Sequence, residues 1–185
     1  MINYKVTMPK FEIIPGRLYH CGIMARRARR EHLSAVAASG LNAHQELRAR
    51  FYESAFCKAW LIDGRLAALG GVTGSSMSPY GYVWLAIAET ATRYPTAIVR
   101  EAKKQLEELM ETRNQIFTLL VPDDDAAERF AIFLGFQVER FGPGSAAYFK
   151  FGRKNLAKFV KSNTDLRVPL GNRYAIPVFY EKEVA

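Results

Sequence analysis

The stretch from residue 81 to residue 136 constrains the fold more than any other part of this chain. Residues 82–88 form a continuous apolar run, which is typical of a strand buried on both faces. A helix is expected from Pro95, because the missing N–H of proline costs nothing at the first helical position. Residues 116–121 form a second buried strand, and a short helix then ends at Gly135. This order of strand, helix, strand and helix predicts an α/β fold.

The two helices of this stretch are predicted from different sequence features: an amphipathic pattern for the longer one and acidic capping residues for the shorter one. The longer one has an apolar face and a charged face, so its apolar side should cover the sheet. Asp123, Asp124 and Asp125 are expected to cap the shorter one, where negative charge complements the helix dipole. Adjacent carboxylates at a helix start cannot all face one ion, and the alternating ligands of a calcium loop are missing, so we expect no metal site. The apolar face of the longer helix consists of Ile98, Val99, Ala102, Leu106, Leu109 and Met110.

The N-terminal third of the chain is expected to supply a strand and two helices. Residues 1–15 end in a Pro-Gly pair and are expected to form a short leading strand or arm. The pattern of residues 17–23 predicts a strand, and that of residues 25–39 predicts a helix that Gly40 ends. A second helix is expected near residues 43–54.

An antiparallel hairpin is the clearest local prediction. Asp63 and Gly64 separate the apolar runs 56–62 and 65–72, and an Asp-Gly pair favours the tight turn that joins antiparallel strands. The segment 73–80 that follows is rich in Gly, Ser and Pro, so a loop is expected there.

The C-terminal part combines two further strands, at residues 136–141 and 146–151, with a basic extension. The net charge of the chain is +8, and residues 150–185 contribute eight basic and three acidic side chains. A polyanion, an acidic protein surface or a phosphate-bearing cofactor would complement this charge. The predicted division is an arm at residues 1–15, one domain at residues 16–150 and the extension at residues 151–185.

Composition narrows the class of protein. A chain of 185 residues, 49% of them apolar, is long enough for one domain with a sizeable core. No apolar run approaches the roughly 18 residues of a membrane span, and the N-terminus has no apolar signal core, so a cytoplasmic protein is expected. Cys21 and Cys57 have no metal-ligand spacing and are expected to be packed thiols.

The order of elements resembles the GNAT superfamily of acyl-CoA N-acyltransferases over about residues 17–150. The most specific match is a helix that carries Ala126 and Phe130 and enters its strand through Leu134, Gly135 and Phe136. The resemblance implies a mixed, mostly antiparallel sheet flanked by helices. It also implies that the strand at residues 82–88 splays from the strand at residues 116–121, and that acetyl-CoA lies between them.

The resemblance assigns cofactor contacts to the end of the first of these strands and to the loop behind it. Backbone groups near Leu85 and Ile87 would face the thioester. The loop at residues 89–97 would receive the pyrophosphate, but it lacks the family's glycines, which makes close backbone approach harder. Arg93, with Thr96 and the N–H groups of Thr96, Ala97 and Ile98, could still hold an anion at the helix start. The alternative is a surface arginine beside a helix-starting proline.

The catalytic positions depart from the family pattern. Ala131 stands where the family has the tyrosine that protonates the thiolate, and Asp124 stands where it has an asparagine near the pantetheine. Glu89 or His20 could act as the base for a substrate amine, and Tyr148 could act as an acid from another strand. A helix-flanking charge and a packed histidine are the alternatives for Glu89 and His20.

A closer resemblance is to the internal virion protein family of short-tailed bacteriophages, which is itself GNAT-like. It implies a protein of the host cytoplasm, or of the virion, whose partners are other virion proteins or a host protein. The matching residues are Leu66, Ala67, Ala68, Leu69, Gly70 and Gly71, then Trp84, Arg93, Arg129, Phe130, Leu134 and Gly135.

Three functions therefore stay open. The leading prediction is a GNAT-fold protein that has lost most of its catalytic groups and acts in virion assembly. The alternative is an acetyl-CoA-dependent N-acetyltransferase that transfers the acyl group directly to an amine. A third is nucleic-acid binding through the basic residues near Lys150 and in the extension, which alternate with aromatic side chains.

Overall fold

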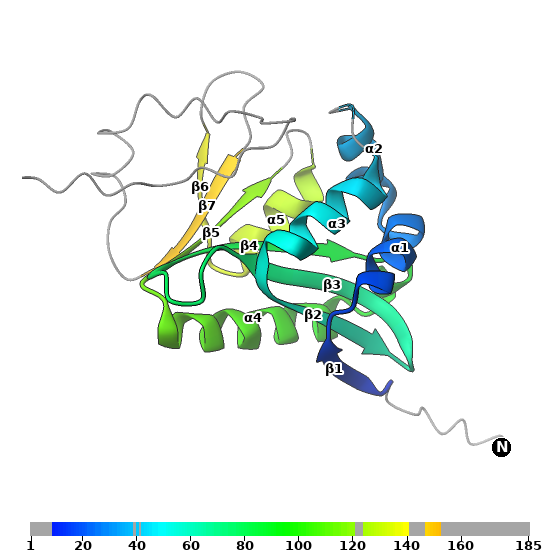
Figure 1. Cartoon of the computed structure of the whole chain (residues 1–185), viewed down its shortest axis with the longest axis horizontal. Coiled ribbons are helices and arrows are strands. Elements are labelled where there is room, and N and C mark those ends of the chain that lie inside the picture. The colour runs from blue at the N-terminus through cyan, green and yellow to red at the C-terminus, as the bar shows by residue number, and fades with distance from the viewer. Residues whose placement is uncertain (1–8, 39, 41, 121–123, 141–146, 153–185) are drawn as a thin grey trace, which may run out of the picture. The chain divides into compact units, whose positions relative to one another are not determined.

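A computed structural model describes residues 9–38, 40, 42–120, 124–140 and 147–152, of which 35, 38, 119, 138–140 and 147–152 are described by their backbone alone. The strands form one seven-stranded sheet in the order β1-β2-β3-β4-β5-β7-β6 (Figure 1). Only β4 and β5 run parallel, so the sheet is mixed and mostly antiparallel, as predicted. The strands are β1 (Phe11–Pro15), β2 (Ser54–Ile62), β3 (Arg65–Thr73), β4 (Tyr80–Ile87), β5 (Gln115–Leu120), β6 (Gln137–Arg140) and β7 (Ala147–Gly152).

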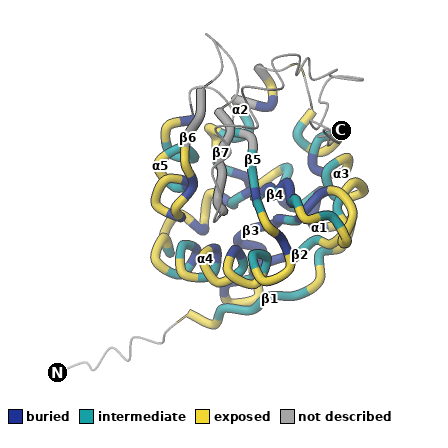
Figure 2. Tube along the Cα trace, turned by 90° about the vertical axis from the view of Figure 1, so that its left-hand side faces the viewer, coloured by how far each residue is buried: buried dark blue, intermediate teal, exposed yellow. Residues whose placement is uncertain are grey.

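Helices cover both faces of the sheet, and each face has its own apolar core. Ile98, Ala102 and Leu106 of α4 share one core with Ala131 of α5. Cys21 and Met24 of α1 share the other with Leu47 of α3. Buried residues concentrate in β3 and β4, while the outer surface of α4 is exposed (Figure 2). The helices are α1 (Leu18–Arg27), α2 (Arg30–Ala38), α3 (Ala43–Glu53), α4 (Pro95–Thr112) and α5 (Asp125–Phe133), with a 3-10 helix, η1 (Glu89–Arg93).

The prediction of a strand at residues 17–23 is wrong, because this segment begins α1. Arg17 is the extended N-cap of that helix, and its N–H donates to Nδ1 of His20 (2.9 Å). Cys21 and Met24 are both fully buried, and their separation of three residues is a helical spacing. A short apolar run fits a strand and a helix equally well, and here the cap decides for the helix.

The single helix predicted at residues 25–39 is two helices. Ala28 leaves helical geometry with a ψ of 155°, and it forms an isolated antiparallel bridge with Ala88. The N–H of Arg29 then donates to the carbonyl of Ile87 (3.0 Å). The helix is therefore interrupted at Ala28 and Arg29, where the backbone pairs with the end of β4 instead.

Most other elements agree with their predictions. β2 and β3 form the expected hairpin, and Asp63 and Gly64 both have positive φ (49° and 73°), as a tight hairpin turn requires. Pro95 begins α4, and Gly135, with a φ of 98°, follows α5. The leading strand is β1, which pairs with β2. Among the described residues, no helix is long and apolar enough to span a bilayer.

The C-terminal predictions fall partly outside the described residues. β6 and β7 take the places of the strands predicted at 136–141 and 146–151. The apolar pattern of residues 173–180 also predicts a last strand in the basic extension. From residue 153 onward, the extension and this predicted strand lie outside the described part of the chain.

Candidate functional site

The two parallel strands separate soon after they begin. β4 pairs with β5 through three residue pairs at the N-terminal ends of both strands. β4 then continues for five residues to Ile87 without pairing to β5, whereas β5 stays paired with β7 along its whole length. The splay that the sequence implied for these strands is therefore present. The pairs are Tyr80 with Gln115, Gly81 with Ile116 and Tyr82 with Phe117.

The separation leaves backbone groups of β4 facing away from β3. The N–H of Ala88 donates to Ala67 on the β3 side, while the carbonyl of Ile87 accepts from Arg29 on the other side. Hydrogen-bonding direction alternates along an antiparallel strand, so Leu85 points its N–H and carbonyl the same way as Ile87. These are the two residues that the sequence assigned to the thioester. Of their four polar groups, the Ile87 carbonyl is already bonded.

The glycine-free loop behind β4 is a 3-10 turn, η1, followed directly by α4. Within the described backbone, the first N–H of α4 to bond inside the helix is that of Ile98, which donates to Tyr94 (3.1 Å). Thr96 and Ala97 precede it, so their N–H groups are left at the helix start. The side chains of Arg93 and Thr96 are exposed there. The expectation that Ile98 would also offer its N–H is wrong.

Asp124 is already engaged on two sides. It is the N-cap of α5, and its Oδ1 accepts from the N–H of Ala127 (2.9 Å). Both of its carboxylate oxygens also accept from Nη2 of Arg29, at 3.1 and 3.4 Å. Ala131, at the position of the family's tyrosine, is buried in the α4 core. The two positions that the resemblance associates with the cofactor thus hold a carboxylate in an ion pair and a buried methyl group.

The candidate bases from the sequence are differently placed. Glu89 is exposed at the start of η1, and its Oε2 accepts from the N–H of Arg30 (3.3 Å). His20 is a buried packed histidine whose Nδ1 is held by the cap of α1. Tyr148 lies on β7, opposite Leu119 of β5, and its side chain is outside the described part. Because β5 separates β7 from β4, the backbone does not bring Tyr148 next to Glu89.

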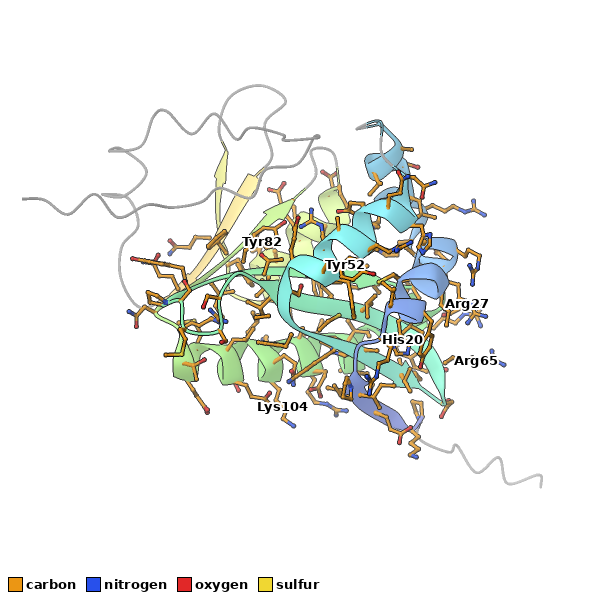
Figure 3. The ribbon with its side chains drawn as sticks, in the orientation of Figure 1. His20, Arg27, Tyr52, Arg65, Tyr82 and Lys104 are labelled. Carbon is orange, nitrogen blue, oxygen red and sulfur yellow. The ribbon has the colours of Figure 1, made fainter. Side chains whose placement is uncertain are left out.

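Sequence analysis missed a set of buried polar residues on the α1/α3 face. Nη1 of Arg50, on α3, donates to the hydroxyl of Tyr82 on β4 (2.5 Å), and Figure 3 shows Tyr82 close to that helix. Nε of Arg50 donates to Glu46 (2.5 Å). Burial is the largest single influence on the pKa of Arg50 and lowers it, but the charges and hydrogen bonds of Tyr82 and Glu46 together outweigh burial, so the pKa is raised. In the sequence, the one signal for these interactions is the spacing of four residues between Glu46 and Arg50, which allows an ion pair on one face of a helix.

His32, on α2, belongs to the same set. Burial is the main cause that lowers the pKa of His32. The carboxylates of Glu46 and Asp124 raise it, and the guanidinium groups of Arg50 and Arg29 lower it. His32 therefore lies within electrostatic range of two carboxylates and two guanidinium groups.

The remaining polar features are the possible metal ligands, the two cysteines and the exposed arginines near α1. In the part of the chain that the structure describes, no three His, Cys, Asp or Glu side chains group as metal ligands. Cys21 and Cys57 are free thiols, and burial raises the pKa of Cys57 to about 12. Arg26, Arg27 and Arg30 are exposed around the break between α1 and α2, and Arg27 and Arg65 both project toward the right-hand edge in Figure 3.

Solved structures with this arrangement of elements include several acetyltransferases. An aminoglycoside acetyltransferase AAC(6')-Ib in complex with coenzyme A matches 80% of this chain and 98% of its own, with a TM-score of 0.56 and 14% identity. RimL, a ribosomal L7/L12 alpha-N-protein acetyltransferase in complex with coenzyme A, matches 79% and 95% (TM-score 0.53, 7% identity). The GNAT domain of PAT from S. lividans matches 75% and 88% (TM-score 0.52, 10% identity).

The chain therefore has the GNAT acetyltransferase fold. At these identities the similarity shows the fold alone. No protein-family model and no curated protein matches the sequence. The resemblance to internal virion proteins of short-tailed phages stays a prediction from the sequence.

Proposed function

We propose that this protein binds acetyl-CoA between β4 and β5 and transfers its acyl group directly to an amine. The observation that carries the proposal is the separation of the two parallel strands, which turns the N–H of Leu85 toward the space that β5 leaves. A backbone N–H fixed in this way can donate to a thioester carbonyl and stabilise the negative charge that develops during attack. The structural neighbours that were solved with coenzyme A support this reading.

The residues around the strand ends fit the cofactor in part. Two free N–H groups at the start of α4, the hydroxyl of Thr96 and the guanidinium of Arg93 can together hold a pyrophosphate. The open backbone of Leu85 can pair with the amide groups of a pantetheine arm, as it would with a neighbouring strand. The bound thioester supplies an activated acyl group. The protein supplies position and the N–H of Leu85.

Three departures set limits on the chemistry. η1 occupies the place of a glycine loop, so fewer backbone N–H groups can surround a phosphate. Ala131 has no proton to give, so a departing thiolate would take its proton from the amine or from solvent. Both carboxylate oxygens of Asp124 accept from Arg29, so this carboxylate is already engaged. We expect slower transfer than with a tyrosine acid.

Calorimetry with acetyl-CoA is the first test. Arg93→Ala should weaken binding at least fivefold, whereas Arg100→Ala, which removes an exposed arginine on α4, should leave it unchanged. Leu85→Pro removes the outward N–H without removing a β3 bond, so it should abolish binding in a folded protein. Leu85→Ala is the control for the lost side chain. No binding by the wild-type protein at millimolar acetyl-CoA would reject the proposal.

The second candidate is a binding protein without turnover, which Ala131 and the Arg29–Asp124 pair favour. In this second reading the protein would be the predicted assembly factor, and its partners would be virion or host proteins. Tight binding of acetyl-CoA with no acetylation of any amine would support this candidate over the first.

Nucleic-acid binding through residues 151–185 is tested separately. If these residues bind DNA, removing them should lower both the affinity for DNA and the dependence of that affinity on salt.

A further inference from the structure

One edge of β4 is used by two different partners. Gly81 pairs with β5, whereas the carbonyl of Ile87 accepts from the N–H of Arg29 (3.0 Å). Backbone groups point to alternate sides along a strand, so those of Gly81, Leu85 and Ile87 lie on the same edge. The link between α1 and α2 therefore takes the place that β5 leaves at the end of β4.

We call this link the strap and define it as residues 28–30. Ala28 forms an isolated antiparallel bridge with Ala88, which comes directly after β4. The N–H of Arg30 donates to Oε2 of Glu89, at the start of η1 (3.3 Å). Each residue of the strap is therefore attached to the end of β4 or to the turn that follows it.

The strap also reaches the other side of the separation between the strands. Nη2 of Arg29 donates to both carboxylate oxygens of Asp124, at 3.1 and 3.4 Å. Asp124 follows β5 in the chain and caps α5. The strap thus runs from the end of β4 to the segment behind β5, and it bridges the wide end of the space between the two strands.

The strap lies on the path that the proposed function gives to the cofactor. The thioester would lie near the N–H of Leu85, and the pyrophosphate near the N–H groups of Thr96 and Ala97 at the start of α4. Ile87 follows Leu85 on the same edge of the strand, on the side that leads to η1 and α4. The arm that joins the thioester to the pyrophosphate must therefore pass the Ile87 carbonyl, which the strap occupies.

Opening the strap requires few interactions to break. Glu89 and Arg30 are exposed, so water can replace the bond between them. The bridge at Ala28 is isolated, without the neighbouring pairs that stabilise a strand within a sheet. The Arg29–Asp124 pair is the strongest attachment, but opening returns both charges to water, which costs less than leaving one of them buried alone. This ion pair therefore decides how often the strap opens.

We propose that residues 28–30 are an autoinhibitory strap, which opens in the folded protein and must leave the Ile87 carbonyl before acetyl-CoA can bind along β4. The inhibitory role rests on the proposed function, whereas the opening is a property of the free protein. Acetyl-CoA binds only the open state, so its apparent affinity is proportional to the fraction of open protein. Weakening the Arg29–Asp124 pair should then increase both the open fraction and the affinity for acetyl-CoA.

The first experiment needs no cofactor. Amide hydrogen exchange is followed by NMR in the full-length protein, and Arg29 is compared with Ala88, whose N–H donates to the carbonyl of Ala67 in β3 (2.8 Å). The Arg29 amide should be protected about tenfold less than that of Ala88, because opening of the strap leaves β3 and β4 paired. Asp124→Asn should speed exchange at Arg29 about fivefold, whereas Asp125→Asn, at an exposed carboxyl, should not change it. Equal protection of the two amides, or an Arg29 rate that Asp124→Asn leaves unchanged, would overturn the proposal.

The second experiment tests the inhibitory role by calorimetry with acetyl-CoA. Asp124→Asn keeps an oxygen for the α5 cap and should tighten binding about threefold. Arg29→Met removes the same ion pair without changing Asp124, so it should tighten binding as well. Arg26→Met, at an exposed arginine of α1, is the matched control and should bind like the wild type. Tighter binding in Asp124→Asn alone would come from the asparagine itself, and weaker binding in both variants would show that the ion pair helps to hold the cofactor, so either result would reject the inhibitory role.

Failure of the strap and failure of the proposed function give different results. If neither the wild type nor the variants bind acetyl-CoA, the proposed function is rejected, while hydrogen exchange at Arg29 still shows whether the strap opens. If all of them bind acetyl-CoA with the same affinity, the proposed function stands and the inhibitory role of the strap is rejected.

Discussion

Nη2 of Arg29 lies 3.1 Å from Oδ2 of Asp124, and the pair joins two ends of the fold that the sheet does not connect. Arg29 is held at the end of β4 by its own N–H, and Asp124 follows β5 and caps α5. The two side chains are 17% and 6% exposed, so the pair is largely screened from water. The strands that separate in the sheet are thus linked again by side chains at their C-terminal ends.

Removing either partner should be strongly destabilising. Asp124→Ala would leave the Arg29 charge partly buried without a partner and would also remove the α5 cap, so we expect a loss of about 3–5 kcal/mol. Asp124→Asn keeps an oxygen for the cap and should lose less. Urea unfolding measures both, and the double variant Arg29→Ala/Asp124→Ala should lose less than the two single losses together.

The exposed pair of Lys10 and Glu12 is the control for this prediction. Its side chains are 72% and 42% exposed, so Glu12→Gln should change unfolding by no more than about 0.5 kcal/mol. Equal effects at Asp124 and Glu12 would contradict a buried, structural role for the Arg29–Asp124 pair.

Arg113 should hold the loop before β4. Its Nη1 donates to the carbonyls of Ser78 and Tyr80 (both 2.9 Å), and its side chain is buried. Arg113→Met would leave these acceptors unpaired, at a cost of about 1–3 kcal/mol. Limited proteolysis should then cut faster near Met77, which is 89% exposed. Arg100→Met on the exposed side of α4 should leave the cleavage rate unchanged.

Two glycines should respond to alanine with opposite signs. A Cβ at Gly71 would lie 2.7 Å from the carbonyl oxygen of Phe56 and 3.1 Å from Nε1 of Trp84, so Gly71→Ala should cost about 1–3 kcal/mol. A Cβ at Gly22, within α1, meets nothing closer than 3.6 Å, and alanine should stabilise that helix by about 0.5–1 kcal/mol. Thermal unfolding of both variants checks the contrast, and equal signs would contradict it.

Stability should fall as the pH is lowered from 7.5 to 5.5. Burial is the main cause that lowers the pKa of His20, with help from Arg17, so the folded-state pKa lies below the usual 6.5. Below pH 6.5 the unfolded chain therefore binds a proton at His20 more readily than the folded protein does. The contribution of neutral His20 to folding stability is complete above pH 6.5 and is lost as the pH falls below it. His32 acts in the same direction.

The measurement is the urea midpoint at pH 7.5, 6.5 and 5.5. His20→Gln retains an acceptor for the N–H of Arg17 but cannot be protonated, so its midpoint should depend less on pH than the wild type's. His44→Gln changes an exposed histidine and should keep the wild-type slope. A His20→Gln slope as steep as the wild type's would show that other groups govern this range.

Local signals explain which elements were predictable. The Asp63-Gly64 turn, Pro95 at the start of α4 and Gly135 after α5 each depend on the conformational range of one or two residues, and each agrees with the structure. The segment around His20 was not predictable in the same way. Its apolar residues fit both periodicities, and the bond between Arg17 and His20 that favours a helix forms only once the turn exists.

The amino-acid sequence by itself determined the order of strands and helices from α3 to α5, and the absence of a tyrosine at Ala131, because both follow from residue types at fixed positions. Tertiary structure alone decided that Arg29 would pair with Asp124 and that the charge of Glu46 would act on His32. These partners are 95 and 14 residues apart along the chain and come from different elements. Burial and pairing of charge depend on how elements pack, and no spacing within one helix or strand encodes them.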